Sequence, residues 1–220
     1  MRYPYCLFRE GLQLRPIFDL RGTPCLIDLS ETSRHRPHMD ASEPRTLQKA
    51  IAADMRGRCD WALGAYLERR ATLLQDCPQM VAEERYYHLG LDIIVPVHTE
   101  LHAPLEATVE ETGYEAGEGN YGGYVLLKHR VAGSRTFYSF YGHLETDSLP
   151  ETGLELPAGA VFARIGDFHE NGNWFHHTHL QILTEEGLRQ GFKLKGYASA
   201  ADLALIHEYC PDPVPLLKVR

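Results

Sequence analysis

The stretch His176-His177-Thr178-His179-Leu180-Gln181-Ile182-Leu183 decides the interpretation of this 220-residue chain. It has the two-residue repeat of a β-strand, in which side chains two positions apart share a face. His177 and His179 are therefore expected to project together, with Thr178 and Leu180 on the reverse face. His176 should point away from this pair, so the sequence predicts a strand that presents two imidazoles on one side.

Two upstream segments contain residue types that could meet this face. The first is His88-Leu89-Gly90-Leu91-Asp92, and the second ends in Tyr141-Gly142-His143. If one strand carries both His88 and Asp92, their spacing of four places them on the same face. Two imidazoles and one carboxylate are a suitable ligand set for zinc, with a fourth position open for water. The sequence thus predicts a zinc site.

The composition is that of a globular protein, with 44% hydrophobic and 24% charged residues. A net charge of −8, with no basic run, argues against a nucleic-acid partner and against an anionic membrane surface. No stretch approaches the roughly 18 apolar residues that a membrane-spanning helix needs. The oligomeric state is left open by the sequence.

The five cysteines, Cys6, Cys25, Cys59, Cys77 and Cys210, are scattered and include no C-x-x-C pair. Reduced thiols explain this pattern better than a disulfide framework or a cysteine zinc site. The first ten residues also lack the apolar core of a secretory signal. These observations predict a cytoplasmic location, and a periplasmic or secreted one only if a signal peptide has been removed.

The N-terminal region, residues 1–80, is expected to form a hairpin and helices that pack on the rest of the chain. Segments 12–18 and 25–29 alternate around the turn former Arg21-Gly22-Thr23, which predicts the hairpin. An apolar stripe from residue 44 to about 75 predicts one long helix or two shorter ones, broken near Gly57 or Gly64, with Ser42 as a cap. A partner-binding helix is the alternative interpretation of this stripe.

The pattern of residues 81–186 is that of an antiparallel β-sandwich or barrel. Short apolar or alternating runs, separated by glycines and prolines, predict strands at 91–97, 105–112, 123–129, 135–141, 160–165 and 177–183. The glycine-rich segment 117–123 is interpreted as a loop beside the site. Residues 187–220 are expected to form a capped helix at 200–209 and a tail. The fold class is therefore α+β with a mostly antiparallel sheet.

Three ordered motifs carry a family resemblance: His88-x-x-x-Asp92, Tyr141-Gly142-His143-Leu144 and His177-x-His179. Together they resemble the lysostaphin-type (LytM-like) zinc metalloendopeptidases, which cut peptidoglycan bridges, over residues 87–184. The resemblance implies a bacterial hydrolase that cleaves a peptide or amide bond in a peptidoglycan-type or glycine-containing peptide. It also implies the roles of five residues: His88, Asp92 and His179 bind Zn²⁺, and His143 and His177 are the catalytic residues beside it.

The residue types agree with this division of roles. Two neutral imidazoles and one carboxylate leave a Zn²⁺ site at net +1, which keeps a bound water acidic, with a pKa around 7. His177 or His143 can then accept a proton from the water or stabilise the oxyanion. We favour His177 as the base and His143 as the orienting group, although the sequence does not separate these roles.

A second resemblance extends outside the motifs, to Leu14-Arg15-Pro16-Ile17-Phe18, Glu170-Asn171-Gly172 and Cys210-Pro211-Asp212-Pro213. These segments resemble the peptidase-like module of bacterial proteins that join a kinase-like phosphotransferase to a class III aminotransferase. The resemblance implies an intracellular relative of that module.

Several alternatives remain at this point. A non-hydrolytic metal-binding regulatory module of the same fold is the main rival, although retention of all five site residues favours an enzyme. A biotinyl- or lipoyl-carrier-like domain shares the glycine-punctuated strands but does not need this histidine set. The asparagine that blocks the zinc of latent secreted relatives has no counterpart before Asn120. Asp40, His35 or His38 could in principle block the metal instead.

Overall fold

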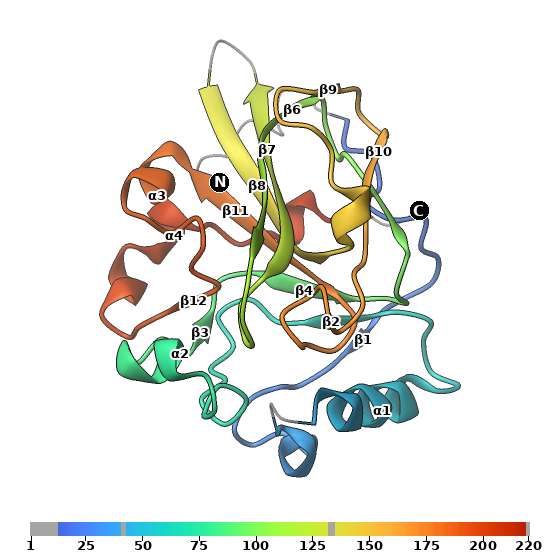
Figure 1. Cartoon of the computed structure of the whole chain (residues 1–220), viewed down its shortest axis with the longest axis vertical. Coiled ribbons are helices and arrows are strands. Elements are labelled where there is room, and N and C mark those ends of the chain that lie inside the picture. Colours follow the sequence, from blue (N-terminus) through green and yellow to red (C-terminus); the bar gives the residue numbers. More distant parts are fainter. Residues whose placement is uncertain (1–12, 41–42, 132–134, 219–220) are drawn as a thin grey trace.

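The computed structural model describes residues 13–40, 43–131 and 135–218. Its centre is an eight-stranded sheet, drawn in Figure 1, with the order β1-β2-β4-β11-β8-β7-β6-β9. All neighbouring strands are antiparallel except β1 and β2. In that order the strands are β1 (Cys25–Leu26), β2 (Ala62–Gly64), β4 (Leu91–Ile94), β11 (Thr178–Thr184), β8 (Arg135–Leu144), β7 (Gly122–Val131), β6 (Ala107–Glu115) and β9 (Glu155–Leu156). The sheet is open, since its two edge strands, β1 and β9, do not pair with each other in the described part of the chain.

Two short strand pairs and several short helices complete the fold. β10 (Val161–Arg164) pairs with β5 (Glu100–His102), and β12 (Tyr197–Ala198) pairs with β3 (Tyr87–His88). The helices are α1 (Pro44–Met55), α2 (Pro78–Ala82), α3 (Glu185–Arg189) and α4 (Ile206–Tyr209), with 3-10 turns η2 (Arg36–His38), η3 (Thr146–Ser148), η4 (Asp202–Ala204) and η5 (Val214–Leu216). α3 and α4 lie beside β11, whereas α1 lies near β1 and β2 (Figure 1).

The two faces of β11 have different roles, as its alternating sequence predicts. Leu180 and Ile182 are fully buried in the main core, which they share with Tyr141 of β8. His179 and Gln181 are on the opposite face, because side chains alternate along a strand. Every residue of β11 is buried, so polar groups on this second face need partners inside the protein.

The strands predicted between residues 91 and 183 are confirmed, as β4, β6, β7, β8, β10 and β11. The mostly antiparallel fold is confirmed as well, as an open sheet. The predicted hairpin is wrong: residues 13–24 contain no strand, and β1 pairs in parallel with β2. The backbone of Ile17 instead accepts a hydrogen bond from His102 N–H at 2.7 Å. Segment 13–18 alternates because it buries Ile17 and Phe18 in the main core.

The predicted helix of residues 44–75 is present only in its first part. α1 ends at Met55, and Gly57 with φ of +72° follows it, which agrees with the predicted break. Leu47 and Ile51 are its buried stripe. The chain then forms β2 rather than a second helix, because that segment completes the sheet beside β4. The predicted cap, Ser42, lies outside the described residues.

The C-terminal helix predicted over 200–209 is broken into η4 and α4. Of the predicted capping box only the Asp202 half is present: the N–H and the hydroxyl of Ser199 both donate to Asp202 Oδ2, at 2.9 and 2.8 Å. The N-cap of η4 is Ala201, without a side-chain cap. α4 ends at Tyr209, before Cys210-Pro211.

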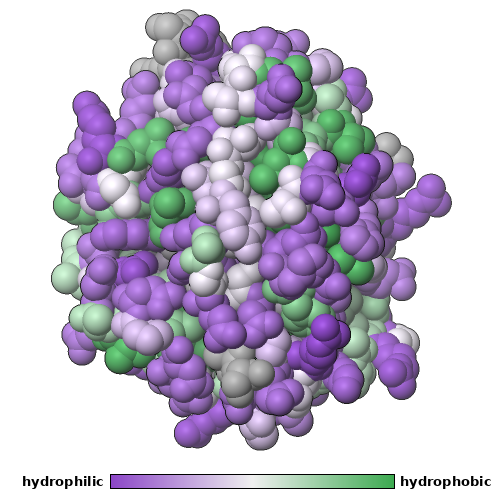
Figure 2. Space-filling model, viewed as in Figure 1, coloured by the Kyte–Doolittle hydropathy of each residue, from purple (hydrophilic) through white to green (hydrophobic). Residues whose placement is uncertain are grey.

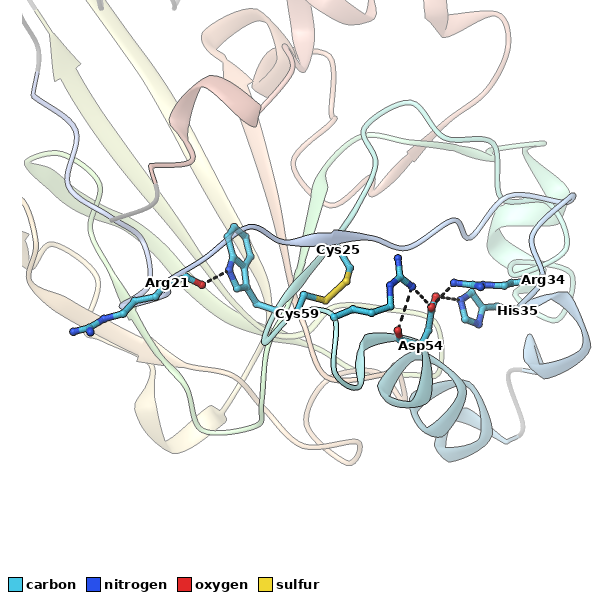
Figure 3. The surroundings of a disulfide bond; sticks show 8 residues. Arg21, Cys25, Arg34, His35, Asp54 and Cys59 are labelled. Atoms are coloured by element: carbon cyan, nitrogen blue, oxygen red, sulfur yellow. Dashed lines mark hydrogen bonds and ion pairs between the residues drawn. A yellow bond between two sulfur atoms is a disulfide. The ribbon is translucent and has the colours of Figure 1, made fainter.

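The prediction of reduced cysteines is wrong for Cys25 and Cys59, which form a disulfide between β1 and the segment after α1 (Figure 3). Cys77 and Cys210 are free and buried, and Cys6 lies outside the described residues. The pairing was missed because 34 residues separate the two cysteines, and only the fold brings them together. Disulfides persist mainly in oxidising compartments, so the cysteines no longer favour the cytoplasm. The cellular location stays a prediction.

Beside the disulfide lies a group of charged side chains that we call the Asp54 cluster, formed by Arg34, His35, Asp54 and Arg58 (Figure 3). Asp54 of α1 accepts hydrogen bonds from Arg34 and Arg58 on Oδ1, and its Oδ2 lies 3.2 Å from His35 Nε2. His35, one of the residues proposed above as a block on the metal, is therefore engaged elsewhere.

The surface carries no extended apolar area on the face shown in Figure 2, where hydrophobic residues form small separate groups among hydrophilic ones. Among the described residues, no helix has the length and apolarity required to cross a bilayer.

Candidate metal centre

Three of the predicted site residues converge at one buried point, which we call the His/Asp cluster: His88, Asp92 and His179. His88 Nε2 lies 2.9 Å from His179 Nδ1 and 3.1 Å from Asp92 Oδ1. The third distance, from His179 Nδ1 to Asp92 Oδ1, is 3.5 Å. All three residues are at most 3% exposed. The fold therefore brings together the ligand set that the sequence predicted.

Strand register explains why these side chains meet. β4 and β11 are antiparallel neighbours in which Asp92 is directly opposite His179, so their side chains share a face. His88 comes from β3, which pairs with β12 outside the main sheet. His88 and Asp92 do not share one strand, the case that the sequence analysis considered, because the chain turns at Leu89 and Gly90 between β3 and β4. Gly90 is required there, because a Cβ would lie 2.5 Å from the His179 ring.

Each imidazole of the cluster has one nitrogen fixed by the protein. His88 Nδ1 donates to the carbonyl of Ala65 at 2.9 Å. His179 Nε2 donates to Gln181 Oε1 at 3.0 Å, and Gln181 is itself oriented by the bond from its Nε2 to the Phe192 carbonyl at 3.2 Å. Carbonyl oxygens only accept, so these nitrogens carry the protons of neutral rings. The remaining nitrogens, His88 Nε2 and His179 Nδ1, present lone pairs to the cluster.

Asp92 is arranged in the same way. Its Oδ2 accepts a hydrogen bond from Arg70 Nη1 at 2.6 Å, and both side chains are 1% exposed. Its Oδ1 is buried and has no hydrogen-bond donor among the described residues. A buried carboxylate oxygen without a donor is costly and calls for an explanation. A cation at this point would supply one.

The spacing of the three lone pairs fits a metal ion. Tetrahedral zinc holds nitrogen and oxygen ligands at about 2.0–2.2 Å, which places neighbouring ligand atoms about 3.3 Å apart. The three observed separations are 2.9, 3.1 and 3.5 Å. With both rings neutral, no proton lies between His88 Nε2 and His179 Nδ1 to relieve their repulsion. The donor set and its geometry therefore fit a divalent cation with a fourth position open.

Buried charges set the protonation of these groups. Burial, followed by the nearby charge of Arg70, lowers the pKa of His88 to about 3. Burial alone would raise the pKa of Asp92, but His88 and Arg70 outweigh it and hold that pKa well below its usual value. Neutral imidazoles and an ionised carboxylate are the forms that bind metal.

His143 reaches the cluster through a β-bulge. Between Tyr141 and Leu144, β8 has one residue more than the facing segment of β7. His143 has a φ of +66°, and its N–H donates to Tyr121 O at 2.9 Å. Without the bulge, His143 would follow Tyr141 into the main core by strand alternation. The bulge turns its ring to the metal side, where the ring centroid lies 4.4 Å from that of His177.

His143 and His177 both have one nitrogen engaged and one available. His143 Nδ1 donates to the Asn171 carbonyl at 2.8 Å, and His177 Nδ1 donates to the Phe175 carbonyl at 2.7 Å. His177 Nε2 then points into the site, 3.4 Å from Asp92 Oδ1. Burial lowers the pKa of His177 to about 4 and that of His143 well below its usual value. Both rings are neutral at pH 7 and can accept a proton.

A cavity of about 520 Å³ adjoins the cluster. Asp92, His143, His177 and His179 line it, together with Gly117, Gly119 and Asn120 of the predicted loop. The predicted loop beside the site is confirmed for residues 117–121, whereas Gly122 and Gly123 already belong to β7. Arg70, Leu73, Gln79 and Met80 line it as well, so the N-terminal region contributes directly to this cavity.

Sequence reasoning missed three neighbours of the cluster: Arg70, Gln181 and Tyr121. Gln181 could have been predicted as a neighbour of the cluster, because it follows His177 and His179 at the same two-residue spacing. Tyr121 touches His179 Nε2 with its hydroxyl at 3.4 Å, and its ring packs on Gly142. Arg70 has no local signal, since it lies 22 residues before Asp92 and is placed by the fold alone.

The other histidines lie outside the cluster. His176 bonds Asp167 at 2.9 Å, as its predicted outward orientation requires, and His129 is buried between the Glu106 carbonyl and Ser139. Among the described residues, the group that could hold a metal ion contains only His88, Asp92 and His179.

The antiparallel sheet thus carries two imidazoles and a carboxylate beside a cavity, with two further histidines next to them, and this arrangement is a candidate metal centre. Residues 86–190 match the model of Peptidase family M23, which agrees with the lysostaphin-type resemblance that the sequence motifs indicate. The matched segment contains all five predicted site residues. No curated protein matches the chain.

Solved structures similar to the chain include three bacterial proteins. A protein of Pseudomonas aeruginosa assigned to peptidase M23 is 26% identical, with 43% of this chain and 37% of that chain covered and a TM-score of 0.35. The catalytic domain of the prophage-encoded M23 protein EnpA from Enterococcus faecalis is 18% identical (51% and 75% covered, TM-score 0.38). Lysostaphin from Staphylococcus simulans is 16% identical (55% and 44% covered, TM-score 0.39). The match thus spans well under two thirds of the first of these proteins.

Proposed function

We propose that this protein is a zinc-dependent metallopeptidase that hydrolyses a peptide or amide bond. The observation that carries the proposal is the convergence of three possible ligand atoms, on His88, Asp92 and His179, at separations of 2.9, 3.1 and 3.5 Å beside a cavity. The match of residues 86–190 to the model of Peptidase family M23 supports the same conclusion. Peptide or peptidoglycan-like substrates are proposed on the basis of that family.

Zinc held by these three residues would lower the pKa of a water molecule to about 7 and polarise the substrate carbonyl. The protein's own residues supply the rest. His177 Nε2 is an acceptor directed at the centre, because its Nδ1 is fixed on the Phe175 carbonyl. We assign it the role of accepting the proton of the attacking water and passing it to the leaving amine.

His143 is the second unligated imidazole, and its neutral ring can orient the water or bond the developing oxyanion. Its position depends on the bulge in β8 and on the Asn171 carbonyl. Arg70 and Gln181 hold Asp92 and His179 in place, as partners of metal ligands commonly do. The cavity gives a substrate access to the side of the cluster where the two catalytic imidazoles lie.

A non-hydrolytic metal-binding module of the same fold is the second candidate. It would need the three ligands but not two further imidazoles with correctly placed acceptor nitrogens. The hydrogen bonds that fix His143 and His177 therefore favour turnover.

Three single substitutions test the proposal. His179→Ala should abolish stoichiometric zinc, whereas His177→Ala should keep zinc and lower the turnover rate by about 10²- to 10⁴-fold. His176→Ala is the matched control, because that neighbouring side chain bonds Asp167 and should change neither property. Metal analysis and a peptide-library cleavage assay provide the readouts. A wild-type protein that binds zinc but cleaves no library member would support the binding module instead.

A further inference from the structure

The cavity beside the His/Asp cluster is also lined by Arg85, whose guanidinium is buried. Arg85 lies between α2 and β3, just before the segment that matches the peptidase family. The residue is only 8% exposed. Arginine is rarely buried to this degree unless its charge is paired.

The hydrogen bonds of Arg85 leave most of its donors unused. Nη2 donates to the Gln79 carbonyl at a long 3.3 Å. Nη1 and Nε are buried and have no hydrogen-bond acceptor among the described residues. Nε does lie 2.9 Å from Glu83 Oε2, but without hydrogen-bond geometry. A planar group with five donors is thus left with a single long hydrogen bond.

Two carboxylates near Arg85 do not satisfy it. Glu83 is 57% exposed, so water screens this ion pair strongly. Glu115 also lines the cavity, and the charge of Arg85 acts on it, but its carboxylate accepts the N–H of Tyr121 at 3.1 Å. No ion pair within 4 Å joins Glu115 to Arg85 among the described residues. Arg85 thus lines the cavity with most of its guanidinium donors unused.

We propose that Arg85 binds a carboxylate of the substrate and so directs hydrolysis to carboxylate-bearing peptides. Resting on the proposed function, this inference names the substrate class: short peptides whose free carboxylate occupies the Arg85 side of the cavity while the scissile carbonyl reaches the His/Asp cluster. A carboxylate matches the planar donor fork of arginine in a way that a neutral amide does not.

The size of the cavity agrees with such a ligand. About 520 Å³ lies within the usual range for sites that enclose small molecules and holds a peptide of a few residues. Gln79, Asn120 and Tyr121 offer further polar groups along the walls between the two charged ends. The carboxylate could be the C-terminal one or that of an acidic side chain, and the experiment separates these sources.

The first experiment compares substrates that differ by one charge. Zinc-loaded protein is assayed with acetyl-trialanine as the free acid and as the C-terminal amide, in L and D forms, and with acetyl-Ala-Glu amide against acetyl-Ala-Gln amide. The wild type should prefer the carboxylate member of one pair by about 10- to 100-fold in kcat/KM. Arg85→Gln should remove that preference, and Arg85→Lys should restore part of it.

Arg189→Gln is the matched control for loss of one positive charge, because Arg189 is an exposed residue of α3 outside the cavity. Zinc content and the melting temperature are measured for each variant, so that a purely structural role of Arg85 is recognised. Such a role would lower the rates for both members of every pair equally, and that result would overturn the proposal. Equal rates for acid and amide in the wild type would overturn it as well.

A binding measurement keeps the proposal testable without turnover. The same peptides are titrated into His177→Ala protein with and without Arg85→Gln, and affinities are compared. A carboxylate preference that disappears with Arg85→Gln supports carboxylate binding by Arg85 even if the wild type hydrolyses nothing. In that case only the proposed function fails. A preference that remains in Arg85→Gln arises from the metal or from Arg70. That result would overturn carboxylate binding by Arg85 and would not contradict the proposed hydrolysis.

Discussion

The Asp54 cluster and the His/Asp cluster contain the same kinds of groups but differ in the partners of one carboxylate oxygen. In both, a nearly buried carboxylate meets histidine and arginine. Asp54 has cationic or imidazole partners on both oxygens. Asp92 has Arg70 on one oxygen only, and the other lies near nitrogens of three imidazoles without a hydrogen-bond donor. The comparison teaches that an unsatisfied acceptor, rather than a gathering of charged residues, distinguishes the candidate metal centre.

The largest effect is expected from removing the carboxylate of Asp92, and a much smaller one from removing that of Asp54. Asp92→Ala should abolish stoichiometric zinc and also lower the free energy of unfolding by about 3–5 kcal/mol, because Arg70 loses a buried partner. Asp54→Ala should keep zinc and lower stability by about 1 kcal/mol or less, since Arg34 and Arg58 are 68% and 54% exposed in their side chains. Metal analysis and urea unfolding measure both. Zinc loss in Asp54→Ala would break the contrast.

The disulfide next to the Asp54 cluster should affect stability but not the metal. Replacing Cys25 and Cys59 by alanine removes a crosslink over 34 residues, which should lower the free energy of unfolding by about 3–4 kcal/mol. Zinc content should not change, because neither cysteine belongs to the His/Asp cluster. Denaturant titration with and without a reducing agent measures the difference. An unchanged stability would mean that the crosslink does not form in solution.

A smaller effect is expected from the support of the second imidazole. Gln181→Met keeps the side-chain length but removes the acceptor for His179 Nε2, so zinc affinity should fall by about 10- to 100-fold. Gln190→Met is the control, because Gln190 bonds only the exposed Glu186 in α3. Competition with a chromophoric chelator measures the dissociation constants. Equal affinities would show that Gln181 does not set the orientation of His179.

The smallest effect at neutral pH is expected for the stability contribution of His129, which has hydrogen-bond partners within the protein on both ring nitrogens. His129 bonds the Glu106 carbonyl and Ser139, and burial lowers its pKa to about 4. Because this pKa lies below the unfolded value of about 6.5, the unfolded chain binds the extra proton. The contribution of His129 is complete above pH 6.5 and is lost as the pH falls toward 4.

His129→Gln should therefore reduce the dependence of stability on pH by up to about one proton between pH 6.5 and 4. Unfolding at a series of pH values, on wild type and variant, measures this slope. Zinc should leave the difference unchanged, since His129 is not part of the cluster. Identical slopes would mean that His129 is equally protonated in the folded and unfolded chains.

The elements that sequence predicted correctly depend on short-range patterns. The alternation in residues 177–183 predicted β11 and the pairing of His177 with His179 on one face, and glycine-bounded runs predicted the other strands. The ordered motifs then indicated the candidate ligand set. Each of these patterns spans at most about ten residues, so it can be recognised without knowledge of the fold.

The elements that sequence missed depend on distant contacts. The alternation of segment 12–18 was equally compatible with a hairpin and with a buried irregular segment, and only packing against β5 decides between them. The Cys25–Cys59 bond and the Arg70–Asp92 pair join residues 34 and 22 positions apart. The φ of His143 and the exposure of Arg85 are set by the surrounding fold, so no local sequence pattern predicts them.

The parallel pair β1 and β2 has a practical consequence for anyone who shortens this protein. β2 covers one edge of β4, the strand that carries Asp92. A fragment trimmed to the family segment would leave that edge unpaired, and open strand edges promote self-association. Such a fragment would also lack Arg70, so low solubility and weak metal retention in it would reflect the trimming and not the chemistry of the intact chain.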